Sequence, residues 1–252
     1  MPGPDRLADA PVRAPHQPLP AYYATPEERR GFIARVFDAA ARDYDRVDRL
    51  LALGTGAWYR GQALLRAGLA PGMRVLDVAV GTWLVAKEAV RIVGDAGSVV
   101  GIDPSAGMMA ASGPGGLVLV RGRAEALPFA AGAFDFLSLG FALRHVDDLE
   151  SVLREFRRVL RPGGRLLVLE ITPPESGLGT ALLKGYLRGA VPWLARLVTR
   201  DPGARRFYRY HWDTIEACAP PARVLATLAA AGFAQVERFV QLGIFSEYRA
   251  TA

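Results

Sequence analysis

Runs of mostly apolar residues alternate with amphipathic stretches through the middle of the chain. The apolar runs lie at residues 74–80, 98–103, 117–120, 134–140 and 165–171. Apolar residues recur at helical spacing over residues 84–93 and from about Asp147 to Leu160, where Arg161-Pro162-Gly163-Gly164 ends the pattern. Near-continuous apolar strands separated by helices are typical of a parallel sheet covered on both faces. The pattern predicts an α/β fold with a doubly wound sheet.

Both ends of the chain follow other patterns. Residues 1–22 are rich in Pro, Ala and Arg without an apolar period, which predicts a disordered, mobile tail. Thr25-Pro26-Glu27-Glu28 supplies a cap, a proline at the first helical position and a capping-box glutamate, so N-terminal helices are expected over residues 23–70. The α/β domain would then occupy residues 71–252. It would close with a helix over about 221–231 and a hairpin formed by AQVERFVQLG and IFSEYRA.

Residues 173 to about 212 interrupt the alternation. Apolar GLGTALLKGYLRGAVPWLARLV is followed by basic, aromatic RDPGARRFYRYHW, which predicts a helical lid insertion. Long insertions are often functional, so the lid could wall a substrate pocket or could merely cover the sheet. Five apolar lid residues would suit a lipophilic substrate, although a helix packed on the core is the commoner case: Leu182, Leu183, Leu187, Trp193 and Leu194.

Composition narrows the functional classes. A length of 252 residues with 51% hydrophobic content supports one large domain. The net charge of +6 comes from dispersed arginines, so we prefer solvated helix faces to lipid or acidic-substrate contacts and expect no nucleic-acid binding. Cys218 is the only cysteine, and no Cys/His spacing fits a metal site. Without a signal-like stretch or a long apolar run, the chain is expected to be cytoplasmic and at most peripheral to a membrane. Its oligomeric state stays open.

A ligand site is indicated where the first strand ends. Asp77 is followed by Ala79, Gly81 and Thr82 at the strand-to-helix turn, where small residues let a ligand approach the backbone and helix N–H groups. Asp103 closes the second strand, from which a carboxylate can accept ribose hydroxyls. Each acid alone could be a strand-end cap or a turn former, and only the joint βαβ context favours a nucleotide-type site. The turn lacks G-x-G-x-x-G, which disfavours a nicotinamide oxidoreductase.

Several motifs resemble one family in the right order. Similarity to the ubiquinone and menaquinone biosynthesis C-methyltransferases, which are class I methyltransferases, runs through LDVAVGT, VVGIDPS, AEALPF, GAFDFLSLGFALRHVDD, LREFRRVLRPGGRLLVLE and AAGFAQVE. The upstream VFDAAARDYDRVDRLLALGTGAWYR is similar to that family's N-terminal helices. The resemblance implies a seven-stranded, Rossmann-like methyltransferase sheet with S-adenosylmethionine as cofactor. It also implies methyl transfer to a small lipophilic or aromatic acceptor such as a quinol.

The resemblance also implies which residues hold the cofactor. Its methionine end would lie near Asp77 and Gly81, its ribose on Asp103 and its adenine against Ala124. Met108 could pack on the adenine ring or simply in the core. Arg123 stands before Ala124, where the family has an acid or an amide, so this chain lacks that contact to the adenine amino group.

Trp83 is the main departure from the family pattern. The family places a glycine after Gly81-Thr82, because the backbone there nearly touches the cofactor. A tryptophan side chain pointing into the pocket would fill the cofactor's space, whereas one pointing away would leave the site open. We expect Trp83 to weaken cofactor binding, since overpacking a tight site costs roughly 1–3 kcal/mol. The alternative is a methyltransferase-fold protein with an impaired cofactor site that acts as a non-catalytic binding or assembly protein.

The segment after the fourth strand carries the candidate chemistry. It reads Phe141-Ala142-Leu143-Arg144-His145, and the family has asparagine where this chain has His145. Arg144 is expected to orient or ionise the acceptor hydroxyl. His145 could be the general base, although a histidine hydrogen-bonded at a strand end is an equal alternative. The candidates for the substrate wall are Tyr44, Phe141 and Tyr208, each of which could instead pack between helices and sheet, and His211 is expected to be structural.

Overall fold

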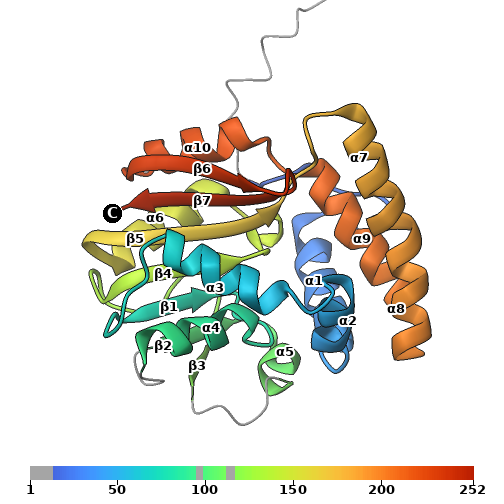
Figure 1. The fold of residues 1–252 in the computed structure, drawn as a ribbon, viewed down its shortest axis with the longest axis horizontal. Helices are drawn as coiled ribbons and strands as arrows, with labels where there is room; N and C mark the ends of the chain where they lie inside the picture. Colours follow the sequence, from blue (N-terminus) through green and yellow to red (C-terminus); the bar gives the residue numbers. More distant parts are fainter. Residues whose placement is uncertain (1–13, 95–98, 112–116) are drawn as a thin grey trace, which may run out of the picture.

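The computed structural model describes residues 14–94, 99–111 and 117–252. Within these residues the centre is a seven-stranded sheet in the order β3-β2-β1-β4-β5-β7-β6 (Figure 1). The strands are β1 (Val75–Val78), β2 (Val99–Asp103), β3 (Val118–Arg121), β4 (Phe134–Gly140), β5 (Leu160–Ile171), β6 (Ala234–Gln241) and β7 (Phe245–Thr251). Neighbouring strands are parallel except at β7, which is antiparallel to β5 and β6. This confirms the predicted fold class.

Helices cover both faces of the sheet. They are α1 (Pro26–Ala40), α2 (Tyr44–Leu51), α3 (Gly56–Arg66), α4 (Leu84–Val93), α5 (Ala106–Ala110), η3 (Leu143–His145), α6 (Leu149–Val159), α7 (Gly177–Lys184), η4 (Gly185–Ala190), α8 (Val191–Thr199), α9 (Ala204–Ala217) and α10 (Pro221–Ala230). Leu76 and Leu137 pack in the layer of α6 and α10, whereas Val75 and Phe136 pack in the layer of α3 and α4. Because neighbouring strand residues point to opposite faces, each central strand packs against both layers and is mostly apolar.

The first helix begins where its sequence predicts. Thr25 caps α1 by accepting a hydrogen bond from the Glu28 amide (3.2 Å), and Pro26 occupies the first helical position. The Glu28 carboxylate accepts from the Ala24 amide (2.8 Å) rather than from the amide of the cap residue. These bonds satisfy N–H groups at the helix entrance and fix where the N-terminal helices start.

Residues 14–22 differ from the mobile tail that their composition predicts. Tyr22 and the adjoining Tyr23 pack against Tyr210 of α9, with ring centroids 5.1 and 6.2 Å from it. Two aromatic side chains are enough to anchor a short segment without a helix or strand of its own, because each buries a large apolar area. The remainder of the expected tail, residues 1–13, lies outside the described residues.

The lid consists of four consecutive helical segments. The helices α7 and α8 are joined by the π-helical η4, and Pro192 lies in the first turn of α8. Proline lacks the N–H of a normal helical hydrogen bond, which accounts for the widened π-helical turn just before it. The lid buries Leu187 and Trp212 in a small core that it shares with α2, and its last helix ends at Ala217. Across the described ranges, no helix is long and apolar enough to cross a membrane.

The turn predicted at residues 161–164 is absorbed into β5. This strand pairs with β4 at Leu160, leaves it, and resumes pairing at Arg165. Gly163 adopts a positive φ of 75° within this bulge, and its amide donates to the carbonyl of the C-terminal residue (2.7 Å). The last two strands form the expected antiparallel hairpin.

Candidate functional site

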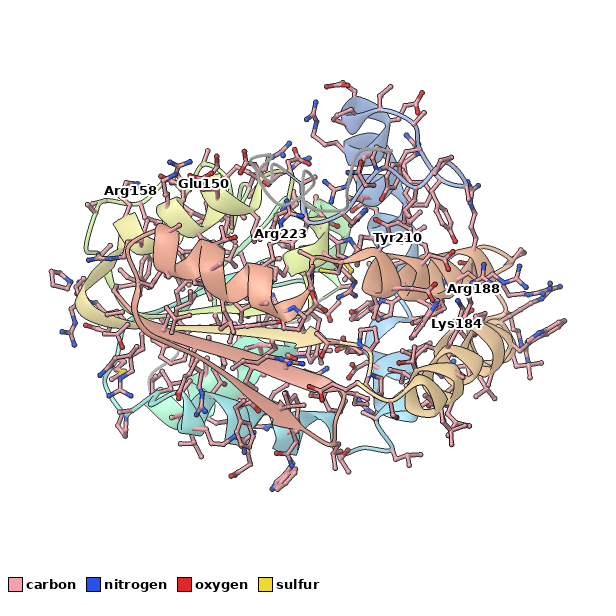
Figure 2. All side chains as sticks on the ribbon, turned by 90° about the horizontal axis from the view of Figure 1, so that it is seen from above. Glu150, Arg158, Lys184, Arg188, Tyr210 and Arg223 are labelled. Atoms are coloured by element: carbon pink, nitrogen blue, oxygen red, sulfur yellow. The ribbon has the colours of Figure 1, made fainter. Side chains whose placement is uncertain are left out.

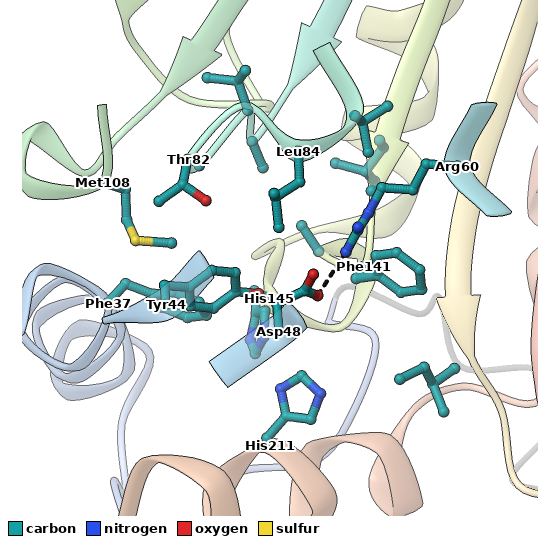
Figure 3. A pocket seen from close by; sticks show the side chains of 18 of the residues that line it. Phe37, Tyr44, Asp48, Arg60, Thr82, Leu84, Met108, Phe141, His145 and His211 are labelled. Carbon is teal, nitrogen blue, oxygen red and sulfur yellow. Dashed lines mark hydrogen bonds and ion pairs between the residues drawn. The ribbon is translucent and has the colours of Figure 1, made fainter. Parts of the chain in front are cut away.

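A large cavity opens at the carboxyl ends of β1, β2 and β4. Its volume is about 630 Å³, which is in the range of small-molecule sites. The turns after these strands form one side, and α1, α2, the lid and the β6–β7 hairpin supply the other walls. The strand order reverses between β1 and β4, where doubly wound sheets bind their ligands. Figure 3 shows this cavity from close by.

The turn after β1 presents its backbone to the cavity. Ala79 and Gly81 have positive φ values of 52° and 54°, and both line the cavity together with Thr82. A left-handed backbone costs a residue with a Cβ roughly 1–2 kcal/mol, and such strain is often found at functional sites. The Gly81 amide donates to the Asp103 carboxylate (2.9 Å), which ties the turn to the end of β2.

Asp103 closes β2 and faces the cavity, as the sequence predicted. Its second oxygen accepts a hydrogen bond from the Ser105 amide (2.8 Å). Burial raises the pKa of Asp103, although the bonds from Ser105 and Gly81 oppose the shift. Each carboxylate oxygen has a further lone pair, so this residue can still accept hydrogen bonds from ribose hydroxyls.

Asp77 lies beneath the same turn and also borders the cavity. The Ser138 hydroxyl donates to its carboxylate (2.6 Å), and the backbone amide of Ala86 in the first turn of α4 also bonds it. Burial raises the pKa of Asp77 to about 7. Asp77 therefore links β1, β4 and the start of α4, and it holds in place the helix end that faces the ligand.

The far side of the cofactor region is built by α5 and the segment after β3. Met108 and Ala124 both line the cavity there. Asp38 of α1 fixes α5, because its carboxylate accepts from the Ser105 hydroxyl (2.5 Å) and the Gly107 amide (3.1 Å). Sequence reasoning missed this role of Asp38, since an acid on an amphipathic helix is usually solvent-exposed.

The residues present fit S-adenosylmethionine. The Thr82 hydroxyl oxygen is buried, borders the cavity and has no partner among the described residues. A Cβ added at Gly81 would lie 3.5 Å from Met108 Cε, so a side chain there would narrow the cavity. Arg123, the departure beside Ala124, is neutralised by an ion pair with Asp147. Among the described residues, no group of three or more His, Cys, Asp or Glu side chains is arranged to hold a metal ion.

Trp83 does not line the cavity. Its backbone is left-handed (φ 70°), a conformation typical of the glycine that the family has here. The side chain is only 5% exposed and packs in the layer of α3 and α4, together with Tyr59 and Val80. Its indole N–H has no hydrogen-bond partner in the described part of the chain. Of the two predicted geometries, the structure therefore shows the outward one, and the expected loss of affinity by overpacking has no geometric basis.

Arg144, expected to contact the acceptor, lies behind the cavity wall. Its side chain is fully buried and forms an ion pair with Glu170. The guanidinium also donates to the Phe141 carbonyl (2.8 Å) and the Thr214 hydroxyl (3.2 Å), and it approaches the His211 ring. These partners hold the guanidinium in the protein interior, and the cavity-lining residues that it contacts are Phe141 and His211.

Two histidines, His145 and His211, border the cavity, whereas Arg144 does not. His145 stacks on Tyr210, and its Nδ1 lies 3.3 Å from the Tyr210 hydroxyl. Its Nε2 is buried and has no partner among the residues described. His211 projects from α9 toward the same region (Figure 3), although the sequence suggested only a structural role for it. Burial, and secondly the charge of Arg144, hold the pKa of both imidazoles well below the usual value, so both rings are neutral near pH 7.

The three residues predicted for the substrate wall all border the cavity: Tyr44, Phe141 and Tyr208. Burial raises the pKa of Tyr44 to about 12, so its hydroxyl stays protonated. An ion pair between Arg60 and Asp48 (2.6 Å) also faces the cavity (Figure 3). Sequence reasoning missed this pair, although Asp48 follows Tyr44 by four residues and therefore shares its helix face.

The strand order and the position of the cavity define a class I methyltransferase fold. The chain superposes with a TM-score of 0.60 on a SAM-dependent methyltransferase from Thermotoga maritima, at 22% identity over 86% of this chain and 98% of that one. It superposes with a TM-score of 0.54 on phosphoethanolamine N-methyltransferase 2 of Haemonchus contortus, solved with S-adenosylmethionine, at 17% identity over 77% of this chain and 52% of that one. These likenesses establish the fold.

Sequence relatives define the family. The profile of the ubiE/COQ5 methyltransferase family matches residues 24–250. The chain is 38% identical to a demethylmenaquinone methyltransferase of Mycolicibacterium paratuberculosis over 81% of this chain and 86% of the relative. It is 37% identical to the ubiquinone/menaquinone biosynthesis C-methyltransferase UbiE of Hahella chejuensis over 75% and 78%. The chain belongs to the ubiE/COQ5 family and is a methyltransferase, as its motifs predicted.

Proposed function

We propose that this methyltransferase uses S-adenosylmethionine to methylate a ring carbon of a prenylated quinol, the reduced form of a demethylmenaquinone-type quinone. The observation that carries the proposal is the composition of the cavity. Acids and exposed backbone lie at its cofactor end, two neutral imidazoles border its acceptor region, and most of the remaining wall is apolar. The names of the family members at 37–38% identity support the same acceptor class.

The cofactor half would position the methyl donor. S-adenosylmethionine, when bound, supplies an electrophilic methyl group on its sulfonium. Asp103 would hold the ribose, the turn containing Ala79 and Gly81 would hold the methionine end, and Met108 with Ala124 would border the adenine. Alignment of the methyl group with its acceptor is the main contribution that such a site makes to an in-line displacement.

His145 is suited to take the proton of the acceptor hydroxyl. A quinol ring carbon becomes a strong nucleophile when the neighbouring O–H loses its proton. The ring of His145 is neutral near pH 7, and its Nε2 is unpartnered among the described residues, so this atom is available to accept the proton. Burial and the charge of Arg144 lower the pKa of this ring, and the negative charge left on the acceptor oxygen would oppose that shift and stabilise the protonated ring. The ring carbon would then bond the methyl group while the methyl–sulfur bond of the sulfonium breaks, after which the ring carbon loses its own proton and the oxygen regains one. The net result would be a methylated quinol, S-adenosylhomocysteine and one released proton.

His211 is suited to stabilise the charge that develops on the acceptor oxygen. The Arg144 Nη2 lies 3.0 Å from Nδ1 of His211 and 3.4 Å from its Nε2. Because a guanidinium only donates, the nearer ring nitrogen accepts, and the neutral ring carries its hydrogen on Nε2. That N–H can donate to a phenolate-like oxygen. Arg144 is thus a positioning residue in this proposal. The residue that would contact the acceptor directly is His211, whereas the motif suggested Arg144.

Labelled methyl transfer tests the proposal. With S-adenosylmethionine and a short-chain demethylmenaquinol kept reduced, we expect the label on a ring carbon. Histamine and phosphoethanolamine should remain unlabelled. Label on oxygen, or faster labelling of either amine, would contradict the acceptor assignment.

Substitution of the base separates chemistry from binding. His145→Leu should lower kcat about a hundredfold with little change in KM, as expected for loss of a general base. His145→Gln is the matched control, because it keeps a polar side chain without a basic nitrogen, and it should be impaired as strongly. A glutamine variant with the wild-type rate would show that only a polar contact is needed at this position.

A further inference from the structure

The outer face of the lid is apolar and exposed. Its members are Leu178, Leu182, Tyr186, Trp193 and Leu197, with Leu182 67% and Leu197 73% exposed. Successive steps of four residues, and one of seven across the π-helical segment, keep them on one stripe of a continuous helix. The helices α7 and α8 form an edge of the molecule away from the central strands (Figure 1). A contiguous exposed apolar surface of this kind marks an interaction site.

The stripe reaches the mouth of the cavity. Leu53, Trp58, Tyr186 and Leu242 line the cavity and are also exposed, Leu53 to 86%. A side chain that is both cavity wall and outer surface must lie at the entrance. The four residues come from the α2–α3 region, the lid and the β6–β7 turn, so the entrance has an apolar rim on several sides. Whatever covers this surface therefore also covers the route into the cavity.

Positive charge borders the apolar stripe. Residues 191–209 contain five arginines and a single acidic residue, Asp201. The exposed members include Arg196 and Arg200, and the Arg205 guanidinium lies 3.9 Å from the centre of the Trp193 ring. By contrast, the two cations of the preceding segment, Lys184 and Arg188, point toward acids of α9 (Figure 2) and are neutralised at 2.6 and 2.8 Å. Arg206 lies over the Tyr22 and Phe32 rings rather than over the ring of Trp193. Among the described residues no acid pairs with Arg196, Arg200 or Arg205, so their positive charge lies at the α8 end of the stripe.

We propose that this surface, defined by the five stripe residues and the four rim residues, docks on an anionic lipid bilayer. An amphipathic helix with leucines and a tryptophan on one side and arginines beside them is suited to lie in a headgroup layer. A second copy of the chain would bring arginines against arginines, so charge complementarity favours the lipid. The proposal rests on the proposed acceptor: a prenylated quinol dissolved in the bilayer would enter the cavity without crossing water.

Vesicle binding tests this docking surface. The full chain should cosediment with phosphatidylcholine vesicles that contain phosphatidylglycerol, bind vesicles of phosphatidylcholine alone more weakly, and lose affinity as salt rises. Leu182→Gln with Leu197→Gln should weaken binding at least about tenfold, since two leucine side chains no longer enter the headgroup region. The matched control, Leu65→Gln with Val118→Gln, alters exposed apolar residues outside the stripe and the rim and should bind like the unmodified chain.

Three results would overturn the docking surface. The first is that the unmodified chain does not bind anionic vesicles at low salt. The second is that the Leu182/Leu197 variant binds them as tightly as the unmodified chain. The third is that the unmodified chain is a dimer in solution, whereas this variant is a monomer. The last result would assign the stripe to a second copy. Activity with a short-chain, water-soluble acceptor separates this test from the proposed function, because the lid variant should keep that activity in full. If the unmodified chain fails on the short-chain acceptor, the acceptor assignment fails whatever the vesicles show.

Discussion

Replacement of Trp83 by glycine should lower folding stability while leaving cofactor affinity nearly unchanged. Deleting a buried tryptophan side chain costs roughly 3–5 kcal/mol. Glycine at φ 70° relieves roughly 1–2 kcal/mol of left-handed strain, and removing the unpartnered indole N–H returns about 1 kcal/mol. The midpoints of these ranges give a net loss of about 1.5 kcal/mol, with extremes of about 0 and 3 kcal/mol. For a chain of this length the midpoint corresponds to a Tm lower by roughly 3–6 °C.

Calorimetry measures both sides of this prediction. Scanning calorimetry gives the change in Tm, and titration with S-adenosylmethionine gives the Kd, which should change less than about threefold because the side chain lies outside the cavity. Trp83→Phe is the matched control: it keeps an aromatic ring, removes the buried N–H and should stay within about 1 kcal/mol of the unmodified chain. Tenfold tighter binding by the glycine variant at unchanged Tm would refute the outward placement.

Three further substitutions test the supporting groups. Burial raises the pKa of Asp77 to about 7, so above about pH 4 the folded chain keeps a proton on this carboxyl that the unfolded chain has lost. The contribution of Asp77 to the free energy of unfolding therefore falls as the pH rises from about 4 to about 7. Asp77→Asn should flatten that slope in denaturant titrations, and an unchanged slope would contradict the burial of this carboxyl. Glu170→Gln leaves the buried Arg144 without its counterion and should lower the free energy of unfolding by about 3–5 kcal/mol, whereas adding Arg144→Met should recover part of the loss. Asp38→Ala frees α5 and should raise the Kd for S-adenosylmethionine several-fold at a stability cost of about 1–2 kcal/mol; an unchanged Kd would show that α5 holds its position without Asp38.

The sheet could be predicted from sequence because its pattern is local. Residues 134–140 and 84–93 are apolar or amphipathic over the same bounds that β4 and α4 have in the structure. The RPGG segment was harder to place, because its glycine turn lies inside β5 as a bulge held by the last residue of the chain. A contact between residues so far apart in sequence leaves no trace in local periodicity.

The residues at the strand-end side of the cavity were predictable for the same reason, whereas many of those on the opposite side were not. Asp77, Gly81 and Asp103 sit at strand ends, where topology alone brings them to the cavity. His211 and Asp48 come from helices of the lid and the N-terminal region, and only the packing of those helices turns them inward. For Arg144 the prediction failed in the other direction. Its motif predicted contact with the acceptor, whereas in the structure it is buried between Glu170 and His211.

The lid shows why an apolar stretch alone cannot distinguish a core helix from a lipid-facing one. Leu182 and Leu183 are neighbours in sequence, yet Leu183 borders the cavity and Leu182 is 67% exposed. A helix that is apolar on opposite sides is normally buried on both, because exposed apolar area is unfavourable in water. The fold covers only the inner side. Contacts with a molecule outside this chain would therefore explain the outer leucines. The arginines beside these leucines indicate that the surface of that molecule is negatively charged.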